Sequence, residues 1–271
     1  MNYLEKILKF FTKYYIIALP LYILAALPSL IGGVGAMGSY AVLMKNLMSL
    51  PTDPTRMQDP TQLIGLFSGI AVAAAGTSFI ALLLNFLAIP STYGMINKAF
   101  QTGSADLNDF VPALKDNIVK YIIYIIGTIV IWLVFTIAAG VVVLVLGVLT
   151  SVIKWLGILL LIIAIICIII AAIILGVLTS LWFPAMVVDN MEVMAGLRKS
   201  IEIAKSCFWT ILGIILLVWL LGVVAGAILG LFGIIPVIGS LIVSIVPTVT
   251  GFAMTVFFVM IYRDKTREGM Q

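Results

Sequence analysis

Long stretches without a charged residue alternate with short charged segments along the whole chain. Charged residues are absent between Lys13 and Lys45, Asp59 and Lys98, Lys120 and Lys154, Lys154 and Asp189, and Lys205 and Arg263. A membrane-spanning helix needs about 20 apolar residues, so the first four stretches hold one span each and the last holds two. The pattern predicts spans at about residues 14–44, 62–89, 121–149, 155–183, 208–231 and 237–262.

The composition agrees with this pattern. Hydrophobic residues make up 63% of the chain and charged residues 10%, whereas soluble domains are about one quarter charged. The first apolar stretch is longer than the roughly 7–15 residues of a cleavable signal peptide, so we expect it to remain as the first span. We therefore expect an all-α fold, a polytopic transmembrane helical bundle that forms a single domain over residues 1–271.

The basic residues are divided unevenly between the two sides of the predicted bundle. If the N-terminus is cytoplasmic, the outer segments hold only Lys45, Arg56 and Lys154. The inner segments hold twelve basic residues: Lys6, Lys9, Lys13, Lys98, Lys115, Lys120, Arg198, Lys199, Lys205, Arg263, Lys265 and Arg267. Cytoplasmic loops of membrane proteins carry such an excess, so we expect a multi-pass protein of the cell membrane with both termini cytoplasmic. The net charge of +4 is scattered over short loops and does not indicate nucleic-acid binding.

Small residues predict where spans contact each other. Gly222, Gly226 and Gly230 recur at four-residue intervals in the fifth span, a pattern typical of tight helix packing in membranes. Residues 65–78 are rich in glycine, alanine and serine, so we place the second span inside the bundle. In the first span, prolines and glycines between residues 20 and 38 predict a bent or broken helix.

The fourth span is almost purely aliphatic, and we expect much of its surface to face lipid. Trp155 and Trp182 bracket it, as aromatic anchors at the two membrane surfaces would. Pro90 is predicted to end the second span.

Three polar residues within the spans are candidate cavity-lining residues: Asn85, Thr248 and Thr250. For Asn85, a hydrogen bond to a neighbouring helix is favoured over ligand binding. The two threonines follow Pro247, where their hydroxyls can either bond their own backbone or line a polar path.

Two polar segments on the inner side, about residues 97–117 and 189–206, are expected to form short amphipathic interfacial helices. Asp109 is predicted to cap a helix in the first segment. In the second, Asp189 fits an N-cap, and Glu192 stands at the spacing of a capping box.

The helix expected at 189–206 has an apolar stripe and a basic edge. The stripe residues, at intervals of three and four, are Met194, Leu197, Ile201, Ala204 and Phe208. Arg198, Lys199 and Lys205 lie largely off the stripe, where they can sit at the level of the lipid phosphates; Arg198 can also pair weakly with Glu202. Together with Asp189 these three residues form the candidate binding site, for a lipid head group or for a partner protein.

The residues around this helix carry a family resemblance. The pattern runs Pro184, Met186, Val187, Val188, Asp189, Met191, Val193, Ala195, Leu197, Arg198, Lys199 and Ser200, followed by Phe208 and Trp209. It resembles the motif of the YciC-like family and of the related membrane domain fused to some glycerophosphodiester phosphodiesterases. The resemblance implies a six-span prokaryotic membrane protein. The chain has no phosphodiesterase domain, so that activity is not implied.

Catalytic residue patterns are lacking in the sequence. It has no histidine, no metal-ligand spacing and no pair of carboxylates within a span. Cys167 and Cys207 are expected to be buried and reduced. We expect a non-enzymatic membrane protein without cofactor or metal, either a scaffold that contacts anionic lipid, a protein partner or a second copy, or a transporter or channel for a small neutral or lipid-like molecule.

Overall fold

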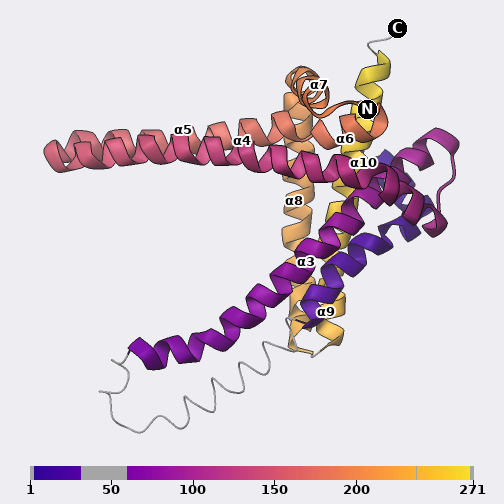
Figure 1. The fold of residues 1–271 in the computed structure, drawn as a ribbon, viewed down its shortest axis with the longest axis horizontal. Helices are drawn as coiled ribbons and strands as arrows, with labels where there is room; N and C mark the ends of the chain where they lie inside the picture. The colour runs from indigo at the N-terminus through magenta and orange to yellow at the C-terminus, as the bar shows by residue number, and fades with distance from the viewer. Residues whose placement is uncertain (1–2, 32–59, 236, 269–271) are drawn as a thin grey trace. The chain divides into compact units, whose positions relative to one another are not determined.

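The computed structural model describes residues 3–31, 60–235 and 237–268, and within the helix at 60–102 it describes side chains from Ser78 onward. The glycine cluster at 32–38 and most of the outer loop at 45–61 lie outside these residues, as do the small side chains at 65–76. All the regular structure in the described part of the chain is helical (Figure 1). The elements are α1 (Tyr3–Tyr14), η1 (Tyr15–Ala18), a helical stretch at 19–31, α3 (Pro60–Thr102), η3 (Leu107–Asp109), α4 (Phe110–Val152), α5 (Lys154–Thr179), α6 (Trp182–Val188), α7 (Val193–Ser206), α8 (Phe208–Gly230), η4 (Leu231–Ile234), α9 (Ile238–Val243) and α10 (Ile245–Glu268).

Six helical segments are long and apolar enough to cross a membrane. They are Tyr3–Ile31, Ser78–Thr102, Leu107–Ser151, Lys154–Val188, Phe208–Gly233 and Ile238–Arg267. The all-helical fold and the six apolar helices predicted from the charge pattern are thus confirmed. They support a multi-pass membrane protein.

Pro90 does not end the second apolar helix, contrary to the prediction, because α3 continues through it to Thr102. A proline within a helix removes one backbone hydrogen bond. The next two side chains bond the backbone of the same turn: Ser91 Oγ donates to the Leu87 carbonyl at 2.6 Å, and Thr92 Oγ1 to the Ala88 carbonyl at 2.6 Å. Such hydroxyl bonds are common where a membrane helix continues past proline.

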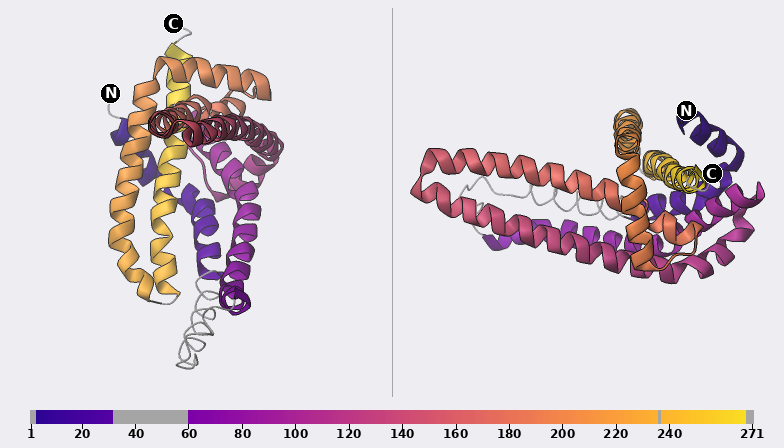
Figure 2. Two further views of the ribbon diagram at one scale, coloured as in Figure 1. Left: turned by 90° about the vertical axis from the view of Figure 1, so that its left-hand side faces the viewer. Right: turned by 90° about the horizontal axis from the view of Figure 1, so that it is seen from above.

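The chain divides into two compact units, Met1–Leu114 with Leu216–Val256, and Lys115–Ile215 with Phe257–Gln271. Helices α4, α8 and α10 each contribute to both units. In the first unit, the core is aromatic where α1 meets α3 and α10: Phe10 stacks on Phe100 at 4.7 Å between ring centroids, and Phe11 meets Phe252 edge-on at 5.6 Å. The second half of α8 runs beside α10 in this unit (Figure 2).

The second unit contains a long antiparallel hairpin of α4 and α5, seen side by side in the right-hand view of Figure 2. A single residue, Ile153, joins the two helices. Gly157 permits this tight turn, because a Cβ at that position would lie 2.5 Å from Thr150 Cα. Most of the hairpin's aliphatic side chains are exposed, as expected for the lipid-facing fourth span.

Candidate functional site

Helix α7 is held against α5 and α6 by a narrow buried face. The buried residues are Gly196, Ser200, Ile203 and Ala204. A Cβ at Gly196 would lie 3.0 Å from Met186 Cγ, so the glycine permits close approach of α7 to α6. Ser200 Oγ donates to the Leu178 carbonyl, in the last turn of α5, at 2.7 Å. The predicted stripe is therefore shifted around the helix: Ala204 is buried, but Met194 is exposed.

Trp182 forms the centre of this packing and is not an exposed anchor, contrary to the prediction. Its side chain is 2% exposed, whereas Trp155 at the other end of the span is 87% exposed. The indole lies directly against Gly127 of α4 and meets Tyr124 edge-on at 5.3 Å. Its Nε1 donates to the Val193 carbonyl at 2.8 Å, which supplies the hydrogen bond that a buried indole requires.

Asp189 does not cap α7, and the predicted capping box with Glu192 is absent. Helix α7 begins at Val193 after Glu192, whose side chain makes no capping bond, while Asp189 ends α6. Asn190 between them has a left-handed φ of 53°, a conformation that asparagine tolerates better than most residues. The Asp189 carboxylate instead accepts a hydrogen bond from Tyr262 of α10 at 2.5 Å.

The end of α10 is buried beside this contact. Tyr262 is fully buried, and Arg263 is 7% exposed. Asp189 and Asp264 lie close enough to Arg263 to interact with it electrostatically, as a buried cation requires. Asp189 therefore joins the end of α6 to the end of α10 within the second unit.

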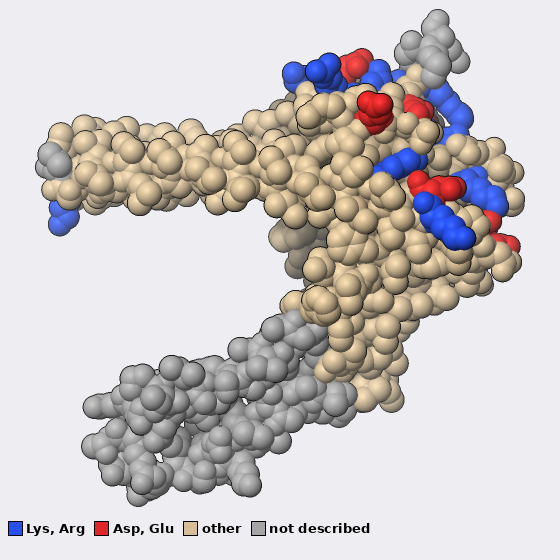
Figure 3. All heavy atoms as spheres, viewed as in Figure 1, with Lys and Arg blue, Asp and Glu red and all other residues tan. Residues whose placement is uncertain are grey.

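The basic residues of α7 lie away from its buried face. Arg198 and Lys205 are exposed, and no described carboxylate forms an ion pair with either. Lys199 pairs with Glu202, and both carboxylate oxygens lie 3.2 Å from Nζ. Glu202 therefore pairs with Lys199 and not with Arg198, contrary to the prediction. Figure 3 shows basic side chains gathered over α7, whereas the α4–α5 hairpin carries no charge beyond Lys120 except Lys154 at its tip.

The three polar residues proposed to line a cavity bond to their own helices. Asn85 Nδ2 donates to the Ala81 carbonyl at 2.8 Å, so the predicted bond to a neighbouring helix is wrong. Thr248 Oγ1 donates to the Ser244 carbonyl at 2.7 Å. Thr250 Oγ1 donates to Val246 at 2.9 Å and to Pro247 at 3.3 Å, which confirms that hydroxyls bond the backbone around Pro247.

One of the three predicted packing glycines makes a close helix contact. A Cβ at Gly222 would lie 3.0 Å from Thr250 Cγ2, so α8 and α10 approach closely there in the first unit. At Gly226 and Gly230 no described atom lies within 4 Å of such a Cβ. The glycine pattern thus identified the correct helix but only one contact.

A comparison with protein families gave one match. The model of a domain of unknown function, DUF7847, matches residues 24–265. The chain belongs to the DUF7847 family. The match includes α7, Asp189 and Tyr262, so the geometry described above lies within the DUF7847 domain. Neither the curated proteins nor the solved structures gave a match.

Two residues that organise the site in this DUF7847 domain, Ser200 and Tyr262, were not predicted from the sequence. Ser200 was named only as part of the family motif, but it is buried and bonded to α5. Tyr262 lies 73 residues from its partner Asp189, so no local pattern could have linked the two. The sequence does contain one signal: Tyr262 follows Ile261 at the end of an otherwise apolar helix, and its side chain carries a hydroxyl that needs a partner when buried.

Both cysteines of the DUF7847 domain are free, as expected. Cys207 is buried beside α7, as predicted, with Sγ 3.1 Å from the Ile203 carbonyl. Cys167 is exposed on the α4–α5 hairpin, so its predicted burial is wrong. Burial raises the pKa of the Cys207 thiol. In the described part of the chain, no group of three or more histidine, cysteine or acidic residues could hold a metal ion.

Proposed function

We propose that this chain is a non-catalytic membrane scaffold whose helix α7 contacts anionic lipid at the cytoplasmic surface of the cell membrane. The observation that carries the proposal is the two-sided construction of α7. Its buried face fixes the helix on α5 and α6, while Arg198 and Lys205 stay exposed without a described acidic partner. A fixed helix with unpaired basic residues is suited to the negative surface of a cytoplasmic leaflet.

The orientation in this proposal has both termini in the cytoplasm. It is supported by the twelve basic residues on the inner segments against three on the outer ones. Cysteines introduced singly as Lys205→Cys and Lys154→Cys, in a chain with Cys167 and Cys207 replaced by alanine, test it. A membrane-impermeant thiol reagent added to intact cells should label only the second variant. Labelling of the first would overturn the orientation.

The resemblance to the YciC-like family supports the same proposal. The residues that carry it, Pro184 to Trp209, coincide with α6, α7 and the start of α8. We propose on that ground that α7 belongs to a surface arrangement shared with those proteins. The motif includes Asp189, whose carboxylate accepts the hydrogen bond from Tyr262 in this chain.

Lipid selectivity tests the scaffold proposal. The purified protein is placed in nanodiscs with equal amounts of phosphatidylglycerol and phosphatidylcholine, and the lipids retained after gentle detergent extraction are counted by native mass spectrometry. Each basic residue near an anionic surface contributes about 1 kcal/mol. The triple variant R198A/K199A/K205A should therefore lose most of the preference for phosphatidylglycerol, by up to about 100-fold.

The matched control is the variant K45A/R56A/K154A, which removes three positive charges from the predicted outer loops. It should keep most of the lipid preference, because its three charges are not gathered on one helix. An equal loss in both variants, or no loss in the first, would count against a specific role for α7. A preference that survives both variants assigns lipid contact to another surface.

A further inference from the structure

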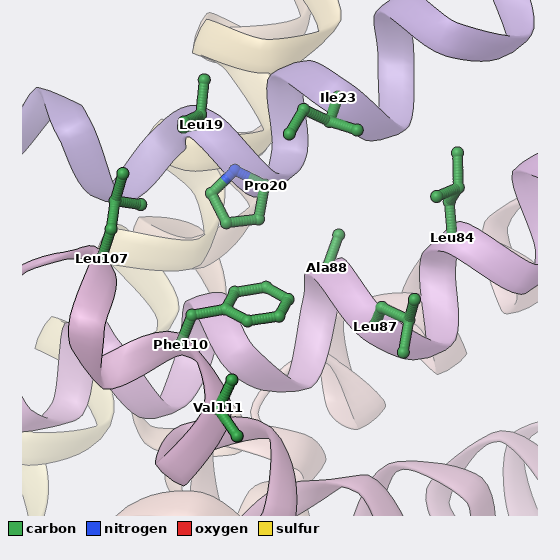
Figure 4. Close-up of a pocket in the computed structure, with 9 residues that line it drawn as sticks. All are labelled: Leu19, Pro20, Ile23, Leu84, Leu87, Ala88, Leu107, Phe110 and Val111. Atoms are coloured by element: carbon green, nitrogen blue, oxygen red, sulfur yellow. The ribbon is translucent and has the colours of Figure 1, made fainter.

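The first unit contains an open apolar pocket of about 330 Å³, lined by three segments that are far apart in the sequence (Figure 4). The segments are residues 19–23, residues 84–88 of α3, and residues 107–111 at η3 and the start of α4. All nine lining residues are aliphatic, proline or phenylalanine. Each segment belongs to a helix apolar enough to span a membrane.

Polar groups lie at one end of this pocket. Figure 4 shows Leu19 and Leu107 at one end and Ile23 and Leu84 at the other. Leu107 belongs to η3, the turn that also contains Asp109. At Leu84 the pocket extends along α3 away from the polar loop that follows the helix.

Near the polar end, one lysine has no acidic partner among the described residues. Lys98 forms an ion pair with Asp109. Lys13 lies over the Tyr14 ring, with Nζ 4.9 Å from the ring centroid, and donates to the Gly103 carbonyl at 3.4 Å. Lys13 is exposed, and no described carboxylate pairs with it. Tyr14 Oη also donates to Gly103, so this lysine is held beside the loop that leads to η3.

We propose that the pocket binds one hydrocarbon tail of a membrane phospholipid, with the lipid phosphate beside Lys13. The bilayer supplies this occupant, because the pocket is built from apolar membrane helices. Its volume is at the lower end of the range of ligand pockets, about 300–1,000 Å³, which suits one tail better than a whole lipid. An almost entirely apolar lining offers water few hydrogen-bond partners, so water is a poor occupant. This site is distinct from α7, and it goes beyond the proposed function.

A phospholipid that carries a photoreactive diazirine in the middle of one tail tests the proposal. The full-length protein is irradiated in nanodiscs, and the labelled residues are mapped by mass spectrometry. Labels should concentrate on residues 84–88 and 107–111. In the variant A88F, the added ring occupies the pocket, and labelling of these residues should fall by about tenfold.

The control A81F introduces the same ring on the same helix, at an alanine that does not line the pocket. It should leave the labelling unchanged. Ala88 is 4% exposed, so A88F can disturb folding. The variant V111F then decides the matter, because Val111 lines the pocket and is half-exposed. Undiminished labelling of the pocket residues in folded V111F or A88F overturns the proposal.

The head-group end is tested by K13A. This variant should retain less of the photoreactive phospholipid, whereas retention of a diacylglycerol with the same tail should not change. An equal effect on both lipids would remove Lys13 from the site. The variant R198A/K199A/K205A should leave pocket labelling intact, so failure of the scaffold proposal and failure of this proposal give different results.

Discussion

The α4–α5 hairpin and the α6–α7 segment belong to the same unit, but they are held in opposite ways. Along the hairpin, long aliphatic side chains are exposed on nearly every turn, with Leu144 and Val145 more than half exposed. In the α6–α7 segment, one indole, one serine hydroxyl and one carboxylate each make a specific bond. Lipid is as apolar as leucine, so aliphatic surface alone provides little attraction between membrane helices. In this unit, therefore, contacts between helices depend on polar side-chain groups and on glycines more than on aliphatic side chains.

The largest effect should come from removing the indole at the centre of the α6–α7 segment. Trp182→Ala leaves a cavity and removes the indole bond to the Val193 carbonyl, and it should lower the free energy of unfolding by about 3–5 kcal/mol. Trp155→Ala, on the exposed end of α5, should lower it by less than about 1 kcal/mol. Reversible unfolding in mixed micelles measures both. Similar losses would mean that the two regions do not differ.

A second test compares the space around one glycine in each region, Gly196 of α7 and Gly176 of α5. Gly196→Leu forces a side chain against Met186, and overpacking of this kind costs about 1–3 kcal/mol. Gly176→Leu on α5 is its matched control, because a Cβ there meets no described atom within 4 Å. Thermal denaturation in detergent should separate the two variants. A destabilised Gly176→Leu would show that the hairpin is packed more tightly than its exposure indicates.

A smaller effect is expected at the bond between Asp189 and Tyr262. Tyr262→Phe keeps the ring but removes the donor to a carboxylate, a loss of about 1.5 kcal/mol in unfolding free energy. Asp189→Asn keeps an acceptor oxygen and should cost less. If Tyr262→Phe were as stable as the unchanged protein, the bond would not hold α10 to α6.

Much of the fold could be predicted because it depends on local composition. Gaps between charges identify six apolar helices, since charge within the bilayer is costly. The errors arose where a distant residue decides the structure. Asp189 and Glu192 have the spacing of a cap, but Tyr262 binds the carboxylate. Trp182 sits where an anchor would, but Gly127 makes room for its burial.

The pocket of the first unit could not be predicted for the same reason. Its walls come from three segments of ordinary aliphatic sequence, and nothing in any one of them marks a cavity. The basic edge of α7, by contrast, was predictable, because Arg198, Lys199 and Lys205 are close in sequence. The buried face of α7 was only partly predicted, because it includes Ser200, a polar residue whose hydroxyl donates to a carbonyl of α5.

The smallest expected effect is on the pH dependence of thiol labelling at Cys207. The raised pKa of the Cys207 thiol lowers its thiolate fraction at any given pH, and the thiolate is the reactive form. Labelling of Cys207 in a Cys167→Ala chain should therefore keep increasing with pH beyond about 8.5, the ordinary thiol value. A plateau below that pH would show that the face of α7 beside Cys207 is open to water.

The contact between Asp189 and Tyr262 also sets an order of events during synthesis. Because Tyr262 follows Asp189 by 73 residues, the ribosome delivers it about 4–15 s later, at 5–20 residues per second. During that interval α6 and α7 already exist, but the carboxylate has no phenol to bind. The α6–α7 segment therefore makes its bond to α10 only after α10 has been synthesised, which places this contact late in assembly.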